Sequence, residues 1–376
     1  MTALRYVRAL ALSLSLAAVG AFGVIGAAAP VHASDSAPVG GQQLARAGVI
    51  VNLKPGVPAP PAMPGASFLI ADMDTGQILA ARAPHRPFLP ASTLKTLTAL
   101  TLIPRFDASA KIMVEPEDVR VEGSHLGIRA GTAYSARTLF QGLLMASGND
   151  AAYTLARANN GVAVTLRDMN TTAAHLGALD TVAKDPSGLD KPGQTSSAYD
   201  LALIGRAAMK LPDFRTYVRT RQASVPGGRS SAGKALPDFK INNHNRLLYN
   251  YGGAVGIKNG YTIAARQTFI AAATRGGKTY ILTELASPNG SWRPNAALLD
   301  WAFAHGAQLS PIGKLVEPGT AAIPGLTSAA GGPTKPKATG SARPPALPPW
   351  VGATGLIGGV TLVGAWTARS ISRRRS

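Results

Sequence analysis

The sequence predicts an α+β domain: an antiparallel sheet that pairs the two ends of the folded region, with helices around it. Two observations lead to this prediction. Short apolar runs flank turn signals both early and late in the chain, and helical patterns occupy the region between them. In addition, none of the 376 residues is cysteine. Strands at both ends with helices between them are typical of this fold class. The absence of cysteine excludes disulfide scaffolds, thiolate metal sites and cysteine nucleophiles.

The expected strands form two hairpins. In the early hairpin, the runs 67–72 and 77–81 flank an Asp-Thr-Gly turn. In the late hairpin, the runs 267–274 and 279–286 flank an Arg-Gly-Gly-Lys turn. Apolar β-leaning runs on either side of such turns are typical of β-hairpins.

Between the hairpins, apolar residues recur at helical spacing, and one more helix is expected after the last strand. The expected helices are 93–102, 136–145, 150–159, 197–209 and 295–305. Pro90 cannot occupy a helix interior, so the first of them should begin at or just after Ser92. The predicted catalytic domain is therefore 65–310, a single-domain length.

The N-terminal residues 1–33 predict a secretory signal peptide. Arg5 and Arg8 precede an uncharged run of mainly Leu, Ala, Val and Gly. Cleavage is expected after Ala33, where small or branched residues stand at the positions that a signal peptidase inspects. An uncleaved anchor is the alternative, and either interpretation exports the chain. A Pro-rich N-terminal segment, 34–64, follows.

The C-terminal region predicts a tether. A Pro/Gly/Ala-rich linker at 311–349 leads into an uncharged segment at 350–368, which contains Trp350 and Trp366 and precedes the basic tail 369–376. Interfacial Trp and a terminal Arg cluster are typical of a transmembrane anchor with a cytoplasmic tail. A sorting tail that is not stably inserted is the alternative. We expect an exported domain on the extracytoplasmic side of the cell membrane.

The formal charge of +19, from 38 Lys+Arg and 19 Asp+Glu, first suggests nucleic acid as a partner. Much of it lies in the terminal segments. Without the signal, spacer and tail, 29 basic and 19 acidic residues remain, a net charge of +10. No basic run with interleaved aromatics occurs in the domain, so we expect anionic envelope polymers and membrane headgroups as neighbours and no nucleic acid.

The first chemical motif pairs a serine with a lysine one helical turn later. Ser92 and Lys95 stand at i and i+3 where a helix should begin, so they face each other. The helix dipole favours a developing alkoxide on such a serine, and an amine in an apolar pocket can lose its proton and act as base. Alone, this spacing is usually an N-cap followed by a solvated lysine.

Two further motifs follow at long separations. Ser147 and Asn149 directly precede the helix expected at 150–159, where an ordinary loop with Asn149 as N-cap is the alternative. Lys258-Asn259-Gly260-Tyr261 comes later, where the alternative is an Asn-Gly turn with an exposed lysine. The ordered set of three motifs in one exported domain favours a serine acyl-transfer site.

With these motifs the chain resembles the serine penicillin-binding proteins, specifically the low-molecular-weight D-alanyl-D-alanine carboxypeptidases of peptidase family S11. The motif set of this superfamily is Ser-x-x-Lys, Ser-x-Asn and Lys-Thr-Gly. The segments 71–76, 185–190 and 243–248 also look like family segments, so the resemblance covers about residues 65–306. It implies a β-lactamase/transpeptidase-like domain.

The resemblance also implies roles in acyl transfer. Ser92 would attack the carbonyl of the penultimate D-alanine in a peptidoglycan stem peptide, and Lys95 would take its proton. Ser147, helped by Lys258, would relay a proton to the leaving D-alanine, and Asn149 would orient the substrate amide. Water would then release the acyl-enzyme. β-Lactam antibiotics would acylate the same serine because they mimic the dipeptide.

The third motif departs from the family pattern, which has Thr or Ser where this chain has Asn259. That hydroxyl would help to bind the terminal carboxylate of the substrate, and the Asn amide differs from it in shape and reach. Lys258 and Gly260 match the family motif, so its positive charge and its strand edge are retained. By resemblance, the oxyanion hole would use the backbone N–H groups of Ser92 and Tyr261. We expect altered substrate affinity or β-lactam sensitivity more than loss of activity.

Two alternatives remain open: a β-lactamase-like hydrolase, and a catalytically weakened homologue that binds peptidoglycan. A class A β-lactamase relies on a glutamate between the second and third motifs, and no Glu occurs from Gly123 to Thr283. No cofactor is expected. The six histidines lack the spacing of metal ligands, and His244 is the one expected near the site.

Overall fold

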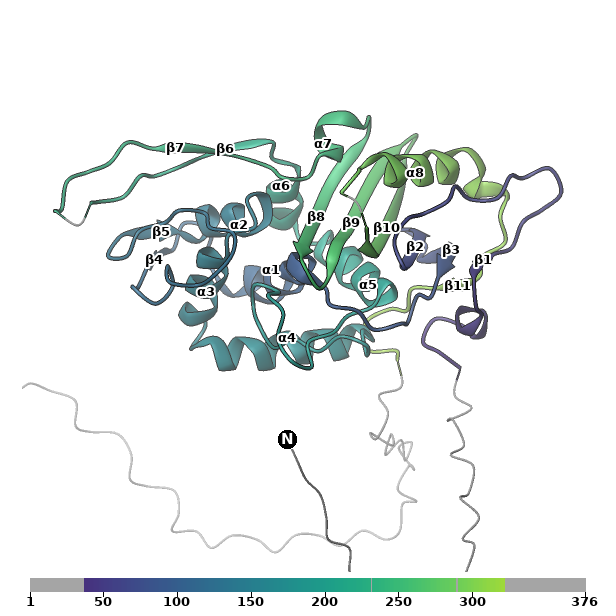
Figure 1. The fold of residues 1–376 in the computed structure, drawn as a ribbon, viewed down its shortest axis with the longest axis horizontal. Coiled ribbons are helices and arrows are strands. Elements are labelled where there is room, and N and C mark those ends of the chain that lie inside the picture. Colours follow the sequence, from purple (N-terminus) through teal and green to yellow (C-terminus); the bar gives the residue numbers. More distant parts are fainter. Residues whose placement is uncertain (1–36, 231, 289, 322–376) are drawn as a thin grey trace, which may run out of the picture. The chain divides into compact units, whose positions relative to one another are not determined.

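The computed structural model describes residues 37–230, 232–288 and 290–321. Its centre is a seven-stranded sheet in which neighbouring strands pair antiparallel (Figure 1). From one edge to the other the strands are β1 (Val49–Val51), β3 (Gln77–Arg82), β2 (Ser67–Asp72), β10 (Lys278–Ser287), β9 (Arg266–Arg275) and β8 (Ala254–Thr262), and β11 (Gly313–Lys314) also pairs with β3. Both predicted hairpins are confirmed, and pairing of β2 with β10 joins the two ends of the domain.

Helices cover both faces of this sheet (Figure 1). Side chains alternate along a strand, so β2 directs Phe68 and Ile70 toward the cluster that contains α8 and directs Leu69 and Ala71 toward the helices on the other face. All six residues of β2 are buried. A strand that is covered on both faces usually has a continuous run of apolar residues, and β2 has such a run.

The predicted helices are confirmed, with shifts of a few residues at their ends. They are α1 (Lys95–Leu102), α2 (Ala136–Met145), α3 (Asn149–Ala158), α5 (Ala198–Ala208) and α8 (Arg293–His305). Further elements were not predicted: α4 (Val162–Leu176), α6 (Pro212–Arg219), α7 (Leu247–Asn250), β4 (Lys111–Met113), β5 (Ala133–Ser135), β6 (Gln222–Val225) and β7 (Phe239–Asn242), and the 3-10 turns η1 (Gln42–Ala45), η2 (Ala91–Leu94), η3 (Ile103–Arg105) and η4 (Gly306–Gln308).

The folded unit extends beyond the predicted range 65–310 at both ends. β1, from the Pro-rich segment, pairs with β3, and β11, from the start of the predicted linker, pairs with the same strand. Met63 is buried, and Trp301 Nε1 donates to the carbonyl of Pro58 at 2.9 Å. The physical reason is that β3 would otherwise present an unpaired edge, and the two terminal segments satisfy its backbone groups.

No helix within the described ranges is long and apolar enough to cross a membrane. The predicted signal peptide at 1–33, the anchor at 350–368 and the basic tail at 369–376 lie outside the described residues, as does the linker beyond residue 321.

Candidate active site

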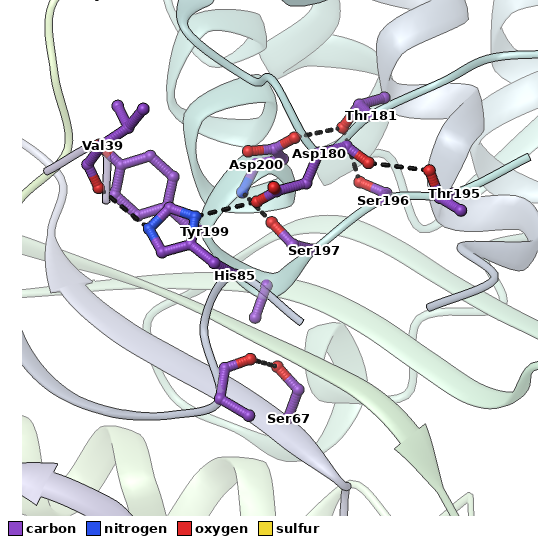
Figure 2. A network of polar contacts seen from close by, with 12 residues as sticks. Val39, Ser67, His85, Asp180, Thr181, Thr195, Ser196, Ser197, Tyr199 and Asp200 are labelled. Carbon is purple, nitrogen blue, oxygen red and sulfur yellow. Dashed lines mark hydrogen bonds and ion pairs between the residues drawn. The ribbon is translucent and has the colours of Figure 1, made fainter. Parts of the chain in front are cut away.

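The loop between β3 and Ser92 is held by a partly buried polar network (Figure 2). His85 Nδ1 lies 2.9 Å from Asp180 Oδ2, and Nε2 lies 3.0 Å from the carbonyl oxygen of Val39. Thr181 Oγ1 donates to Asp200 Oδ2 at 2.7 Å, and burial, with a smaller contribution from Asp180, raises the pKa of Asp200 well above its usual range. These contacts attach the loop that leads to Ser92 to the segments around Val39 and Asp180.

Ser92 lies in the 3-10 turn η2, which leads directly into α1, and α1 begins at Lys95. The residue before it, Ala91, has φ +47°, a left-handed conformation that costs a non-glycine residue about 1–3 kcal/mol and is often found at functional sites. Gly188 packs so closely on the Ala91 carbonyl that no Cβ would fit between them. The turn that contains Ser92 therefore packs against the segment 185–188.

Lys95 is fully buried and its amine contacts three oxygens. Nζ lies 3.0 Å from Ser92 Oγ, 2.7 Å from Asn149 Oδ1 and 2.6 Å from the Ser187 carbonyl oxygen. Burial, followed by the nearby charge of Lys258, lowers the pKa of Lys95 well below its usual value of 10.5. Desolvation penalises the ammonium form, so this amine is suited to accept a proton.

The second motif forms the turn between α2 and α3. Ser147 is buried and has φ +61°, the second non-glycine residue near the site in a left-handed conformation. Asn149 is the first residue of α3 rather than its N-cap. Its Nδ2 donates to the Glu122 carbonyl at 2.6 Å, which orients the amide so that Oδ1 faces Lys95.

The third motif lies in the middle of β8 and contains no turn. Lys258 is fully buried, donates to the Asn259 carbonyl oxygen at 2.6 Å, and has its pKa lowered by burial to about 7. Its charge also lowers the pKa of Lys95 and that of His244, although burial is the larger cause in both cases. The two lysines and the histidine therefore share one electrostatic environment, as expected for His244.

Gly260 is the point at which β8 touches the nucleophilic turn. A Cβ at this position would lie 2.7 Å from the backbone nitrogen of Ser92 and 2.5 Å from Thr268 Oγ1. Thr268, on β9, donates to the Pro90 carbonyl at 2.8 Å and so ties the sheet to the same turn. Only glycine allows this approach, which explains why the motif needs it.

Asn259 and Tyr261 lie on the opposite face of β8 from Lys258. Asn259 pairs with Phe269, which packs in the cluster around α8, whereas Lys258 pairs with Ile270, which packs under the helices of the other face. Tyr261 is 59% exposed. The structure thus brings Ser92, Lys95, Asn149 and Lys258 together, with Gly260 against them. Asn259 instead lines a separate cavity.

Sequence reasoning missed several positioning groups. The Ser187 carbonyl, which holds Lys95, carries no side-chain signal because it is a backbone group, and only the family resemblance points to its segment. Thr268 looked like an ordinary strand residue. Among the described residues, no group of three or more His, Asp or Glu side chains could hold a metal ion.

Comparisons with known proteins agree on one family. A family model described as D-alanyl-D-alanine carboxypeptidase matches residues 55–288. The D-alanyl-D-alanine carboxypeptidase DacB2 of Mycobacterium tuberculosis is 42% identical over 259 residues, which are 67% of this chain and 86% of that protein.

Solved structures support the same assignment. The crystal structure of a D-alanyl-D-alanine carboxypeptidase from M. tuberculosis H37Rv matches with TM-score 0.65 and 39% identity, over 70% of this chain and 99% of the other. The Streptomyces K15 DD-transpeptidase matches with TM-score 0.62 and 29% identity, over 66% and 100%. The predicted transpeptidase-like fold is therefore confirmed. Because the family model spans more than half of the chain and the M. tuberculosis relative matches over most of its own length, this chain belongs to the serine-type D-alanyl-D-alanine carboxypeptidases of peptidase family S11.

Proposed function

We propose that this chain removes the terminal D-alanine from peptidoglycan stem peptides through an acyl-enzyme on Ser92, and that β-lactam antibiotics acylate the same oxygen. The observation that carries the proposal is the setting of Lys95. It is buried, its Nζ lies 3.0 Å from Ser92 Oγ, and its pKa is lowered mainly by burial. A base within hydrogen-bond reach of a hydroxyl is what nucleophilic activation requires.

The contacts of Lys95 match a neutral amine. A neutral amine has two N–H bonds and one lone pair. The acceptors Asn149 Oδ1 and the Ser187 carbonyl take the two N–H bonds, which leaves the lone pair to accept the hydroxyl proton of Ser92. The serine oxygen then attacks the carbonyl carbon of the penultimate D-alanine, and the backbone N–H groups of Ser92 and Tyr261 stabilise the oxyanion.

The leaving D-alanine must gain a proton when its C–N bond breaks. Ser147 passes this proton, and Lys258 assists because its amine titrates near neutral pH. Water then hydrolyses the acyl-enzyme, releases the shortened peptide and restores Ser92. Asn149 orients the substrate amide while its Oδ1 holds Lys95.

We also propose that the domain works outside the cytoplasm on a membrane tether. The support is the sequence: a signal-like run at 1–33, a Pro-rich linker, and an apolar segment at 350–368 followed by arginines. A peptidoglycan substrate is consistent with this location, and the charge distribution supports no nucleic-acid partner.

The test of the proposed activity compares two reactions of the wild-type protein. We expect D-alanine release from a pentapeptide ending in D-Ala-D-Ala to be the main reaction, and hydrolysis of a chromogenic cephalosporin to be slow, because no glutamate between the second and third motifs is available for deacylation. Release is measured with a D-amino acid oxidase assay. Predominant cephalosporin turnover without D-alanine release would reject the proposal in favour of the β-lactamase alternative.

The rate should also depend on pH in a defined direction. Protonated Lys95 has no lone pair, so it cannot accept the serine proton. We expect kcat/KM for D-alanine release to rise as pH increases through the lowered pKa of Lys95, well below the ordinary lysine value of 10.5. A profile measured between about pH 5 and pH 11 checks this. A rate that rises only near the ordinary lysine pKa would contradict Lys95 as the base.

A further inference from the structure

A cavity of about 230 Å³ lies on the α8 face of the sheet, next to the catalytic strand, and shares Thr268 and Asn259 with the elements described above. Its lining residues are His244, Arg246, Asn259, Gln267, Thr268, Phe269, Glu284, Gly290, Ser291, Trp292 and Asn295. An apolar cavity of about 150 Å³ holds a benzene ring, so this one has room for a long side chain. The methyl group of a terminal D-alanine would leave most of it unfilled.

The cavity contains buried hydrogen-bond acceptors. Glu284 and Asn295 are each 3% exposed. Glu284 Oε1 accepts from the Gly65 N–H at 2.8 Å, and Oε2 accepts from Asn295 Nδ2 at 3.0 Å. The bond to the Glu284 carboxylate fixes the orientation of the Asn295 amide. Its oxygen, Oδ1, is buried and has no hydrogen-bond partner among the described residues. A buried acceptor of this kind is costly to leave unpaired, so it favours a ligand that brings a donor.

The basic groups of the cavity lie at its exposed side. His244 and Arg246 are exposed, whereas Glu284 and Asn295 are buried. Arg82, whose charge acts on Glu284, donates from Nη2 to the carbonyls of Met63 and Gly65. A substrate with a C-terminal carboxylate would therefore meet the Arg246 guanidinium at the mouth, and a donor carried on its side chain would meet acceptors within.

The cavity is also within reach of the scissile bond. Asn259 lines it and directly precedes Gly260, which packs against the Ser92 backbone nitrogen. Neighbouring residues of a strand lie about 3.3 Å apart along it, so the cavity lining begins one residue along β8 from the contact with Ser92.

We propose that this cavity receives the side chain of the substrate's C-terminal D-residue, and that it selects a side chain that ends in an ammonium group. Asn295 Oδ1 and the Glu284 carboxylate accept its hydrogen bonds. The proposal rests on the proposed carboxypeptidase activity and adds that the leaving residue need not be D-alanine. The bond cleaved is the same, and the α-amine of the D-residue leaves with the proton that D-alanine would take.

The test uses three peptides, diacetyl-L-lysyl-D-alanyl-D-X, in which X is alanine, lysine or norleucine. Norleucine matches the lysine side chain without its amine. We expect wild-type kcat/KM for the D-lysine peptide to exceed that for the D-norleucine peptide at least tenfold. Glu284→Gln should reduce this ratio at least tenfold, because a Gln amide at 284 can itself donate to Asn295 Oδ1 and removes the negative charge.

A matched control is Glu317→Gln, which removes a carboxylate that bonds to Arg206 at 2.8 Å and does not line the cavity. The ratio should stay at its wild-type value in this variant. Equal rates for D-lysine and D-norleucine in the wild type would overturn the proposal. So would a loss in Glu284→Gln that is the same for all three peptides, because that result indicates a structural role alone.

A failure of the proposed activity can be distinguished from a failure of the cavity proposal. If the wild type releases no D-alanine, the carboxypeptidase assignment fails first. Binding of the D-lysine and D-norleucine peptides to full-length Ser92→Ala is then measured by calorimetry. Preference for D-lysine, lost in the double variant with Glu284→Gln, supports the cavity proposal, and equal affinities overturn it.

Discussion

Replacement of Ser92 by alanine is expected to lower D-alanine release at least about a thousandfold and to abolish covalent labelling by a fluorescent penicillin. The substitution removes the single oxygen that lies 3.0 Å from the amine of Lys95. It keeps the backbone N–H that packs against Gly260, so the fold of the turn should be unchanged. Gel fluorescence after labelling measures acylation, and a D-alanine assay measures turnover.

The control for this variant is Ser224→Ala, which changes an exposed serine on β6. We expect it to label and turn over like the wild type, and we expect all three proteins to unfold at similar temperatures. Labelling that survives in Ser92→Ala would show that another nucleophile carries the reaction. A folded wild-type protein that takes no label would support the weakened, peptidoglycan-binding homologue instead.

Replacement of Lys95 by methionine is expected to lower kcat/KM by a factor of about 10²–10⁴, the usual contribution of a general base. Methionine fills similar space but offers no lone pair to the Ser92 hydroxyl and no donors to Asn149 Oδ1 or the Ser187 carbonyl. The residual activity should also lose the rise with pH that the wild type shows. This second readout separates a lost base from a disturbed pocket, because misplacement alone would preserve the pH profile.

The control is Lys54→Met, an exposed lysine in the N-terminal segment. It should leave both the rate and the pH profile as in the wild type. A Lys95→Met protein that keeps its rise with pH would mean that another group is the base, and Lys258, with its pKa lowered to about 7, would be the first to examine.

Local patterns were sufficient for the elements that carry most of the site. The strand runs of the two hairpins, the helix after Pro90 and the helices on either side of Ser147 could be read from periodicity and turn residues, because these depend on neighbours in the chain. α4 and α6 were missed although both are regular helices. Neither helix has a side-chain cap: α4 follows Gly161, and α6 follows Leu211, although Pro212 at its first position is itself a start signal.

The limits of the domain could not be read in the same way. The segments around β1 and β11 have the composition of spacers, rich in Pro, Gly or Ala. They are ordered because the edge of β3 lies beside them and takes their backbone hydrogen bonds. Pairing between residues so far apart in the chain depends on the assembled sheet, which local composition does not encode.

The sequence alone determined which residues could react, because the three-residue spacing places Ser92 and Lys95 on one helical turn whatever surrounds them. What those residues can do depends on segments that the fold brings to them. It brings Asn149 and Ser187 to the amine of Lys95, places Lys258 close enough to depress its pKa, and turns Asn259 toward a different cavity. The physical reason is that a lysine becomes a base through desolvation and nearby charge, and both are set by segments distant in the chain.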